Sequence, residues 1–387
     1  MKIRVVHIIA KLELGGAQEC VLDLLKHLDP LRFETFLITG SEGILLPDAE
    51  KIRGLNLIII PEFKREIRPG KDLLALGKMA AILWKLRREN PRILINTDGS
   101  KAGILGRWAG WLAGIPVRIH SFHGFGFNDY QNFLVRSLYI FSEWITARIS
   151  TRMIFVSRSN LEKARGYGIL TGDRGVIIRC GINQERFRKV AIDRAEKRKE
   201  LGFSPESPLV GMIACLKPQK SPLDYVRVAR LVKTEIPDCQ FLLAGDGVLR
   251  PQMEDLVREL EMEESFRILG WRRDIPEIMK TLDLLVLTSL WEGLPLVFIE
   301  ALAAGVPIVA TRVDGAEEII EEEVNGSLCA PRDIPDLARK VIRWLQAEKR
   351  DKKAESHRLG EYEIELMVKN HEGFYQGFFP PNQSGRG

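Results

Sequence analysis

Two glutamates, Glu292 and Glu300, flank a Gly-Leu-Pro turn that opens a short apolar segment. Pro295 stands where the first residue of a helix would lie, and its missing N–H costs nothing at that position. The N–H groups around Leu294 and Leu296, with the helix dipole, would then make an anion site that suits a diphosphate. Helical side chains lean toward the N-terminus, so Glu300 could accept hydrogen bonds from a ribose diol while Glu292 reaches another hydroxyl. Carboxylates for hydroxyls and amides for phosphate together describe a sugar-nucleotide site.

The context of this pair carries more weight than the pair itself. Two glutamates at this spacing are common by chance in a chain with 28% charged residues. Here, however, a buried-strand pattern over residues 282–288 precedes the turn, and the helix after it stops at Gly305 and leads into another strand. This order favours the functional interpretation.

Two lysines, Lys217 and Lys220, follow the first strand of the second half of the chain. A lysine at that edge could neutralise a diphosphate leaving group, which is the main electrostatic task in glycosyl transfer from a nucleotide. The alternative is an exposed basic turn.

Glycines follow two predicted strands, as Gly15-Gly16 and in the Gly245-Asp246-Gly247 segment. Paired glycines let a backbone approach a phosphate or a sugar closely, although a plain tight turn has the same composition. Neither segment is a G-x-G-x-x-G motif, so a dehydrogenase is disfavoured.

His123 lies just after the predicted strand 117–120. At a strand end it could orient or deprotonate an acceptor hydroxyl, or bond a donor sugar, whereas a lone histidine is more often structural. Asp98 and Phe125 occupy similar positions, and we expect them to line the acceptor side.

Composition limits the class of protein. The chain has 387 residues, 45% of them hydrophobic, which suits two domains with ordinary cores. Its five cysteines are scattered and form no C-x-x-C pair, which indicates a reducing compartment and argues against disulfides and a zinc site. The opening MKIRVVHIIA is too short for a signal peptide and is interpreted as the first strand. No apolar stretch approaches the roughly 20 residues of a membrane span.

Charge is distributed unevenly. Residues 1–184 contain 27 Lys and Arg against 17 Asp and Glu, whereas the remainder contains 30 against 35, for a net charge of +5 overall. No nucleic-acid motif accompanies the basic half, so an anionic membrane surface or a phosphorylated substrate is the better expectation. Two segments, residues 64–92 and 127–152, combine basic residues with apolar and aromatic ones and could lie on anionic lipid. The alternative is that their apolar faces belong to the domain core.

Short apolar runs alternate with helix-length segments, which predicts parallel β/α units. The predicted strands are residues 5–9, 35–38, 57–60, 93–96, 117–120, 153–156, 176–178, 209–214, 240–244, 266–269, 284–288, 307–310 and 326–329. The predicted helices are residues 18–28, 72–89, 103–113, 133–148, 159–166, 222–234, 250–260, 275–281, 295–304, 315–320 and 334–348. The expected fold class is therefore α/β, with two doubly wound Rossmann-like domains facing a central cleft, and a site beyond the carboxyl ends of the strands.

Domain boundaries follow from the same pattern. We predict an N-terminal, acceptor-side domain over residues 1–184 and a C-terminal, nucleotide-sugar-binding domain over residues 185–360. The segment 181–199 is polar and reads as a hinge. Residues 361–387 would form a C-terminal helix and tail that pack back on the first domain, with the final PPNQSGRG disordered.

The chain resembles glycosyltransferase family 4, the retaining group with the GT-B fold. The resemblance follows the family's motif order across nearly the whole chain. It rests on Gly15-Gly16, His123-Gly124, Gly181-Ile182-Asn183, Lys220, Gly245-Asp246-Gly247, Glu292-Gly293-Leu294-Pro295 with Glu300, and Asp314-Gly315 to Gly326. It implies a nucleotide-sugar donor, no required metal or other cofactor, and net retention at the anomeric carbon.

The resemblance also implies residue roles. Glu300 would hold the ribose, and Glu292 with the Gly293–Leu296 amides would hold the donor sugar and phosphates. Lys220 would stabilise the departing diphosphate, Gly16 would approach the phosphate, and His123 would contact the donor sugar. The remaining donor-binding residues implied are Lys217, Gly245, Trp271 and Arg272.

One position departs from the family pattern. Where the family usually has an arginine five residues before the lysine, this chain has Cys215, and a thiol cannot replace that cation at neutral pH. We hypothesise that Lys217 supplies the charge.

A subset of the family with similar Thr-x-Gly-Ser-Lys-Ala-Gly-Ile-Leu-Gly and Phe-His-Gly-Phe segments builds bacterial surface polysaccharides on lipid carriers. The expected function is therefore transfer of a hexose or N-acetylhexosamine, from a UDP-sugar, to a lipid-linked or oligosaccharide acceptor. The expected location is cytoplasmic, peripheral at the inner face of the cytoplasmic membrane. A nucleotide-sugar epimerase of the same architecture and a non-catalytic sugar- or lipid-binding relative are the alternatives.

Overall fold

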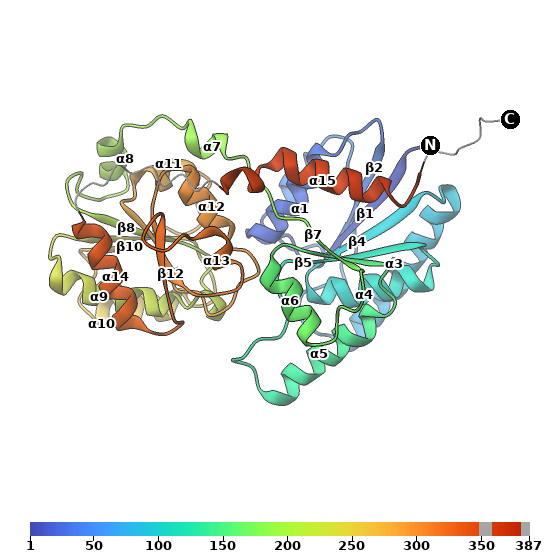
Figure 1. Cartoon of the computed structure of the whole chain (residues 1–387), viewed down its shortest axis with the longest axis horizontal. Helices are drawn as coiled ribbons and strands as arrows, with labels where there is room; N and C mark the ends of the chain where they lie inside the picture. The colour runs from blue at the N-terminus through green and yellow to red at the C-terminus, as the bar shows by residue number, and fades with distance from the viewer. Residues whose placement is uncertain (348–357, 381–387) are drawn as a thin grey trace. The chain divides into compact units, whose positions relative to one another are not determined.

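The computed structural model describes residues 1–347 and 358–380 of the chain. The chain divides into two units (Figure 1). Unit 1 contains Met1–Gly181 and Ile364–Gly387, and unit 2 contains Ile182–Glu363. The predicted boundaries after residues 184 and 360 each lie within three residues of these. The tail that was predicted to be disordered begins at Pro380, and its residues after Pro380 lie outside the described part of the chain.

Unit 1 is built on a seven-stranded sheet in the order β3-β2-β1-β4-β5-β6-β7, and all its pairings are parallel. Its strands are β1 (Ile3–Ile9), β2 (Phe33–Thr39), β3 (Asn56–Ile59), β4 (Ile93–Asp98), β5 (Val117–Phe122), β6 (Arg152–Phe155) and β7 (Gly175–Ile177). Its helices are α1 (Gly16–His27), α2 (Leu46–Glu50), α3 (Pro69–Glu89), α4 (Ser100–Leu112), α5 (Phe133–Ala147), α6 (Arg158–Gly166) and α15 (Ile364–Gln376).

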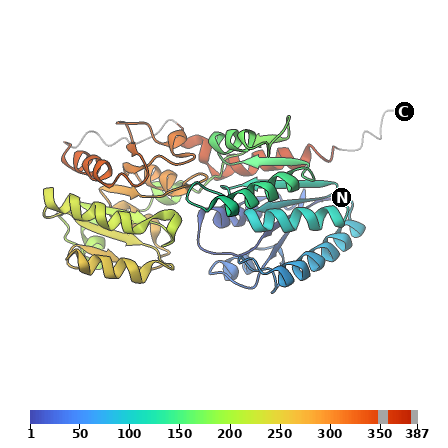
Figure 2. The ribbon, with the colours of Figure 1, turned by 90° about the horizontal axis from the view of Figure 1, so that it is seen from below.

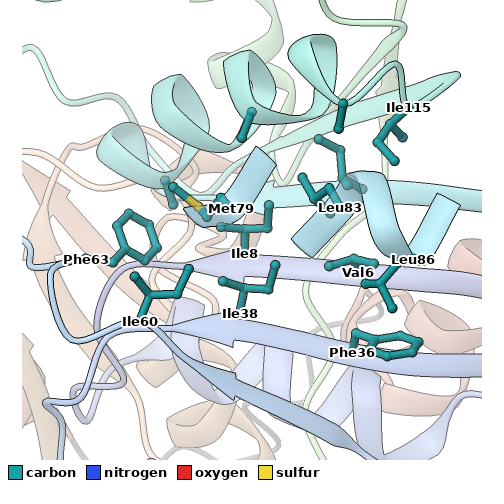
Figure 3. Close-up of a cluster of buried hydrophobic side chains, with 14 of the residues drawn as sticks. Val6, Ile8, Phe36, Ile38, Ile60, Phe63, Met79, Leu83, Leu86 and Ile115 are labelled. Atoms are coloured by element: carbon teal, nitrogen blue, oxygen red, sulfur yellow. The ribbon is translucent and has the colours of Figure 1, made fainter. Parts of the chain in front are cut away.

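Alternation along β1 explains why helices lie on both faces of this sheet (Figures 1 and 2). Val6 and Ile8 point to one face and pack with Met79 and other residues of α3, as Figure 3 shows. Ile9 belongs to a second cluster, with Val21 and further residues of α1. Because both faces are covered, the strands read as continuous apolar runs.

The C-terminal helix α15 belongs to unit 1, although it is far in sequence from the rest of that unit. Glu372 accepts a hydrogen bond from the Asp29 backbone at 2.8 Å, and the Tyr375 ring meets Phe33 of β2 edge-on. Beyond the helix, Arg92 donates to the Phe379 carbonyl at 2.8 Å. The expectation that a C-terminal helix crosses back to the first domain is confirmed.

Unit 2 is built on a six-stranded parallel sheet in the order β10-β9-β8-β11-β12-β13. Its strands are β8 (Leu209–Ile213), β9 (Gln240–Ala244), β10 (Phe266–Ile268), β11 (Leu284–Leu287), β12 (Ile308–Thr311) and β13 (Gly326–Cys329). Its α-helices are α7 (Glu185–Arg188), α8 (Arg194–Glu200), α9 (Pro222–Glu235), α10 (Arg250–Glu259), α11 (Ile275–Thr281), α12 (Leu296–Ala303), α13 (Ala316–Ile319) and α14 (Ile334–Gln346). The described part of unit 2 also contains the 3₁₀ turns η1 (Pro218–Lys220) and η2 (Leu359–Tyr362).

Every predicted strand is present, and the doubly wound α/β class is confirmed. The polar segment 181–199, predicted as a hinge, contains the chain crossing after Gly181 and also the helices α7 and α8; its role as a hinge stays a prediction. Charge did not prevent folding there, because Arg198 of α8 is buried and donates to the Thr281 carbonyl and the Asp283 carboxylate. The short helix α2 was also missed, since its five residues are too few for a helical period.

Each sheet has one point where the strand order reverses, between β1 and β4 in unit 1 and between β8 and β11 in unit 2. Connections leave in opposite directions there, so the carboxyl ends of those two strands flank a crevice at the sheet edge. Most of the predicted site residues lie at the end of one of these four strands or in the segment after it.

Candidate active site

A lysine and a glutamate meet at the switch point of the unit 2 sheet. Nζ of Lys220, after β8, lies 2.5 Å from Oε1 of Glu292, after β11, and both side chains are largely buried. Ser289 donates to the same oxygen at 2.6 Å, and Gln219 donates to Oε2 at 3.3 Å. The structure thus joins two predicted residues and adds two that fix the carboxylate's orientation.

The backbone also sets this geometry. Ser221, which follows Lys220, has φ 44°, a left-handed conformation that side chains rarely adopt. The Thr288 hydroxyl at the end of β11 lies 3.0 Å from the Lys220 carbonyl and 2.8 Å from the Ser221 carbonyl. The Leu290 amide donates to the Gln219 carbonyl at 2.7 Å. These contacts tie η1 to the loop after β11.

The Gly-Asp-Gly segment after β9 packs against the loop that carries both lysines. A Cβ on Gly245, with φ 148°, would lie 1.9 Å from the Ala214 carbonyl oxygen, and one on Gly247 would lie 2.6 Å from that of Leu216. The Leu216 amide donates to the Asp246 carbonyl at 2.9 Å. Only glycine permits this approach of two backbones. A contact of Gly245 with the donor stays a prediction.

Helix α12 begins at Leu296 with Pro295 as its N-cap, one residue later than the sequence suggested. The turn before it is buried, and Glu300 is half-buried on the second turn of the helix. Gly315 supports this turn from behind, since a Cβ there would lie 2.6 Å from the Gly293 carbonyl oxygen. The Asp-Gly motif of the sequence therefore has a structural role: it packs under the turn that carries the predicted anion site.

At the end of β10, Arg272 forms a bidentate ion pair with Asp274, at 2.7 and 2.5 Å. Lys197 also lies 3.0 Å from Asp274, and both cations hold the pKa of that carboxyl below its usual range. The ring of Trp271 is partly exposed and could stack on a base. The framing of a base by these residues stays a prediction.

Lys217 is the N-cap residue of η1, and its backbone amide donates to the Cys215 carbonyl at 2.9 Å. Both side chains are half-buried at the edge where Lys220 lies. Compensation for the missing arginine by Lys217 therefore stays a hypothesis with a compatible position.

In unit 1, the glycine pair after β1 begins helix α1, with Gly15 as N-cap and Gly16 as the first helical residue. The amides of this first turn point along the helix axis, as an anion site requires. The approach of Gly16 to a phosphate stays a prediction.

The other unit 1 residues form a buried charge network at the β1/β4 switch point. His123 Nε2 donates to Asp98 Oδ1 at 2.9 Å, and His7 Nδ1 donates to Oδ2 at 2.8 Å. The Tyr375 hydroxyl, from α15, lies 3.2 Å from His7 Nε2 and accepts from Asn96 at 2.9 Å. Because the carboxylate accepts on both oxygens, both histidines are fixed in orientation.

The charges of this network follow from burial and from each other. Burial favours neutral Asp98, but His7 and His123 outweigh it and hold its pKa well below the usual range. Burial likewise disfavours protonated His123, but the Cys180 sulfur and Asp98 outweigh it and raise the pKa of His123 to about 10. At neutral pH His123 is therefore an imidazolium, which donates hydrogen bonds and cannot act as a general base.

One sequence-based expectation changes as a result, and a second stays a prediction. Asp98 is only 2% exposed and holds His123, so it does not line an acceptor surface. Phe125 packs in an aromatic row with Phe122 and Phe127, at ring distances of 5.1 and 4.8 Å. Its contact with an acceptor stays a prediction.

Little in the sequence indicates the rest of the network. His7 was visible as a polar residue within an apolar strand, but Tyr375 lies 368 positions away, and nothing local connects them. Within the described residues, one group has metal-ligand atoms close together: Cys20, His123 and Cys180. Because these three residues are far apart in sequence, their proximity could not be predicted from it either.

Comparison with known proteins gives the family. The chain is 30% identical over 346 residues, 88% of its length and 88% of the relative's, to the UDP-Gal:alpha-D-GlcNAc-diphosphoundecaprenol alpha-1,3-galactosyltransferase of Escherichia coli. Residues 14–186 match Glycosyltransferase Family 4, and residues 193–364 match Glycosyl transferases group 1. The chain belongs to glycosyltransferase family 4. It is therefore a glycosyltransferase, and membership gives no support to the epimerase alternative.

Other similar proteins agree with this family. The N,N'-diacetylbacillosaminyl-diphospho-undecaprenol alpha-1,3-N-acetylgalactosaminyltransferase of Campylobacter jejuni is 27% identical over 341 residues, 85% of this chain and 86% of the relative. HepE of Anabaena, solved with UDP and glucose, has a TM-score of 0.80 at 20% identity and covers 97% of this chain and 100% of its own. WaaG, a glycosyltransferase involved in lipopolysaccharide biosynthesis, has a TM-score of 0.76 at 16% identity, covering 96% and 100%. The structural matches show the shared GT-B fold.

As for membrane spans, none of the helices among the described residues is both long and apolar enough to cross a bilayer.

Proposed function

We propose that this glycosyltransferase moves a hexose or N-acetylhexosamine from a UDP-sugar to a lipid-linked or oligosaccharide acceptor, with retention at the anomeric carbon. The observation that carries the proposal is the Lys220–Glu292 pair at the unit 2 switch point, beside the N-terminus of α12. The printed names of the Escherichia coli and Campylobacter relatives, both acting on diphospho-undecaprenol substrates, support the acceptor class and surface polysaccharide synthesis. The Escherichia coli name and the UDP bound to HepE support the nucleotide.

The site residues divide the chemical task. Glu300, one to two turns into α12, accepts from the ribose hydroxyls, and the amides at the start of α12 bind the diphosphate. Lys220 neutralises the charge that develops on the leaving diphosphate, and Glu292 orients both Lys220 and a donor hydroxyl. Positive charge thus comes from a lysine and backbone dipoles, which supports catalysis without a metal or other cofactor.

The role of His123 follows from its charge. As an imidazolium whose two N–H groups meet Asp98 and Cys180, it would offer positive charge to the donor sugar rather than remove a proton from the acceptor.

The test is calorimetric titration of UDP, GDP and ADP, and then of their sugars, into wild type, Glu300→Ala and the control Glu263→Ala. We expect UDP to bind most tightly, at least tenfold more weakly in Glu300→Ala, and unchanged in the control, where an exposed loop glutamate is removed. Preference for GDP or ADP would contradict the UDP assignment. Equal UDP affinity in Glu300→Ala and wild type would contradict the site.

A peripheral membrane location is the second part of the proposal, and α5 supports it. Phe133, Leu134, Leu138 and Phe141 on this helix are 75%, 73%, 62% and 56% exposed. The side of α5 that faces the unit is partly polar, because Glu143 forms a buried ion pair with Arg107 of α4 at 2.6 Å. Exposed apolar residues opposite a polar inner side fit insertion into a lipid interface.

The two basic segments predicted from sequence therefore differ. In residues 64–92 one side of α3 forms domain core, with Ala75, Met79 and Leu83 fully buried. Leu73, Leu74 and Trp84 of the same helix are exposed, but α5 carries more exposed apolar residues. In residues 127–152 the apolar side of α5 faces outward, with Arg148 stacked on Trp144. Contact with the anionic inner face of the cytoplasmic membrane is thus assigned to α5.

Vesicle co-sedimentation tests this assignment. We expect wild type to bind phosphatidylglycerol-containing vesicles more than phosphatidylcholine vesicles, and the triple variant Phe133→Ser, Leu138→Ser, Phe141→Ser to bind at least tenfold more weakly. The control removes two exposed apolar residues of unit 2, Val248→Ser and Val324→Ser, and should bind as wild type. Equal binding by the triple variant would contradict the role of α5.

A further inference from the structure

Two cysteines that are 160 positions apart meet inside unit 1. Cys20 lies on α1 and Cys180 lies after β7, and both are buried. The Sγ atoms are 2.8 Å apart, with the Cys20 thiol donating to the Cys180 sulfur. The Sδ atom of Met367, on α15, lies 3.4 Å from Cys20. All five cysteines of the chain are free thiols, so this is a dithiol and not a disulfide.

The surroundings of Cys180 make its sulfur the reactive one. Nδ1 of His123, an imidazolium, faces it at 3.6 Å. The hydrogen bond from Cys20 and then the charge of His123 lower the pKa of Cys180 to about 6, whereas the same contact raises the pKa of Cys20. By contrast, burial raises the pKa of Cys239 and of Cys329 to about 12. Thiolates and not thiols are nucleophiles, so the chain distinguishes one cysteine from its other buried ones.

A metal ion fits this group less well than a covalent bond between the sulfurs. Two thiolates on one tetrahedral zinc, with bonds of about 2.3 Å, lie roughly 3.8 Å apart, about 1 Å more than here. Disulfide formation needs the sulfurs to approach to about 2.05 Å. The observed separation is nearer to that value.

We propose that Cys20 and Cys180 form a peroxide-sensitive dithiol that closes to an intramolecular disulfide. The Cys180 thiolate attacks one oxygen of hydrogen peroxide, the O–O bond breaks, and hydroxide leaves and takes up a proton to become water. Cys20 then loses its proton and attacks the Cys180 sulfur, the S–O bond of the sulfenic acid breaks, and a second water leaves. Two thiols and one peroxide give one disulfide and two waters, so two electrons pass from the sulfurs to the peroxide.

Access and consequence both involve His123. Its side chain is 12% exposed while both cysteines are buried, so the imidazole edge is where the group comes nearest to solvent, and the proposed route of a small oxidant passes it. Oxidation removes the negative sulfur that faces His123 and links α1 to the residue just before Gly181, where the chain leaves unit 1. The oxidation is independent of the proposed transfer reaction, and only its effect on turnover rests on that reaction.

The experiment treats the full-length protein with hydrogen peroxide, blocks remaining thiols under denaturing conditions, and maps peptides by mass spectrometry. Wild type should lose two of its five thiols and yield one linked pair, Cys20–Cys180, reversed by dithiothreitol. The matched control Cys239→Ser, which removes another buried cysteine, should give the same pair. Cys20→Ser should stop at a Cys180 sulfenic acid that dimedone traps, and Cys180→Ser should lose no thiol.

The contradicting outcomes are equally definite. Five remaining thiols in wild type, or a pair that includes Cys239 or Cys329, would overturn the proposal. A bound metal ion in native mass spectrometry of the untreated protein, lost in Cys180→Ser, would also overturn it in favour of a metal site. Because the wild-type measurement stands alone, a variant that fails to fold does not affect the conclusion.

Discussion

At the scale of single residues, Asp98 and His123 show how a charge is kept inside unit 1. Asp98 is nearly fully buried, and it stays ionised because two histidine N–H groups share it. His123 stays protonated for the complementary reason, with Asp98 on one nitrogen and the Cys180 sulfur facing the other. Neither group could hold its charge there alone.

Replacement of Asp98 tests this coupling. In Asp98→Asn the shape is kept but the charge is lost, so the pKa of His123 should fall from about 10 by at least one unit. The measurement is NMR titration of labelled histidine ring resonances. In wild type a raised pKa contributes stability that is present below about 6.5 and is lost as pH rises toward 10. Thermal unfolding at several pH values should show less of this alkaline loss in the variant. An unshifted His123 would contradict the coupling.

Lys217 offers a second prediction at this scale. If it replaces the family's arginine, Lys217→Ala should lower kcat by about 10²–10³, the usual cost of one transition-state donor. Cys215→Arg in that background should restore most of the rate, because it returns a cation two residues away. The control is Lys233→Ala at the far end of α9, where Nζ bonds the Pro237 carbonyl. Unchanged turnover in Lys217→Ala would contradict the compensation.

At the scale of elements, the candidate site residues lie in loops after strands, and close backbone contacts at glycines fix the conformation of these loops. The loop after β8 is fixed by the Gly-Asp-Gly segment after β9, and the turn before α12 is fixed by Gly315. Backbone contacts of this kind position amides and carbonyls to a few tenths of an ångström. Side-chain patterns in the sequence report them only indirectly.

Gly315→Ala, with Gly305→Ala as its control, isolates that effect. Both glycines have similar positive φ, 77° and 78°, so alanine strains both by about 1 kcal/mol. Only at Gly315 would the new Cβ meet another backbone, at 2.6 Å from the Gly293 carbonyl oxygen, whereas Gly305 has open space. We expect UDP affinity, measured by calorimetry, to fall at least tenfold in Gly315→Ala alone. Equal affinities in the two variants would show that the turn tolerates the shift.

At the scale of the whole molecule, the two units are joined by two chain crossings, after Gly181 and after Glu363. Unit 2 is continuous in sequence, whereas unit 1 needs α15 to complete it. That helix buries Ile364, Met367, Val368 and Tyr375, and its tyrosine hydroxyl pairs with His7 and Asn96. Each large apolar side chain of this kind contributes about 1.5–3 kcal/mol when fully buried.

Truncation after Glu363 should therefore destabilise one unit selectively. We expect hydrogen exchange of β1 and β4 amides to speed up by at least tenfold, while exchange of β8 and β11 stays as in wild type. Tyr375→Phe should show a smaller effect in the same direction, because it leaves two buried polar groups without their partner. Equal acceleration in both sheets would contradict the assignment of α15 to unit 1.

The sequence alone determined every strand, the longer helices, the doubly wound class and the family, whereas it did not predict α2, α7 and α8. Parallel strands that are covered on both faces appear in the sequence as apolar runs, and the helix after each run is recognised by its 3.6-residue hydrophobic period. Glu292, Glu300, Lys220 and His123 could therefore be placed in the segments that follow the strands. The Gly-Leu-Pro turn was readable for the same reason, since its backbone demands local residue types.

Only the tertiary structure decided which of these residues touch. Strand order brought β8 beside β11 and so paired Lys220 with Glu292, 72 positions away. The return of α15 brought Tyr375 to His7, and α1 brought Cys20 to Cys180. Such contacts depend on packing between elements distant in sequence, and packing fixes the charge of His123 and the reactivity of Cys180. No local pattern encodes it.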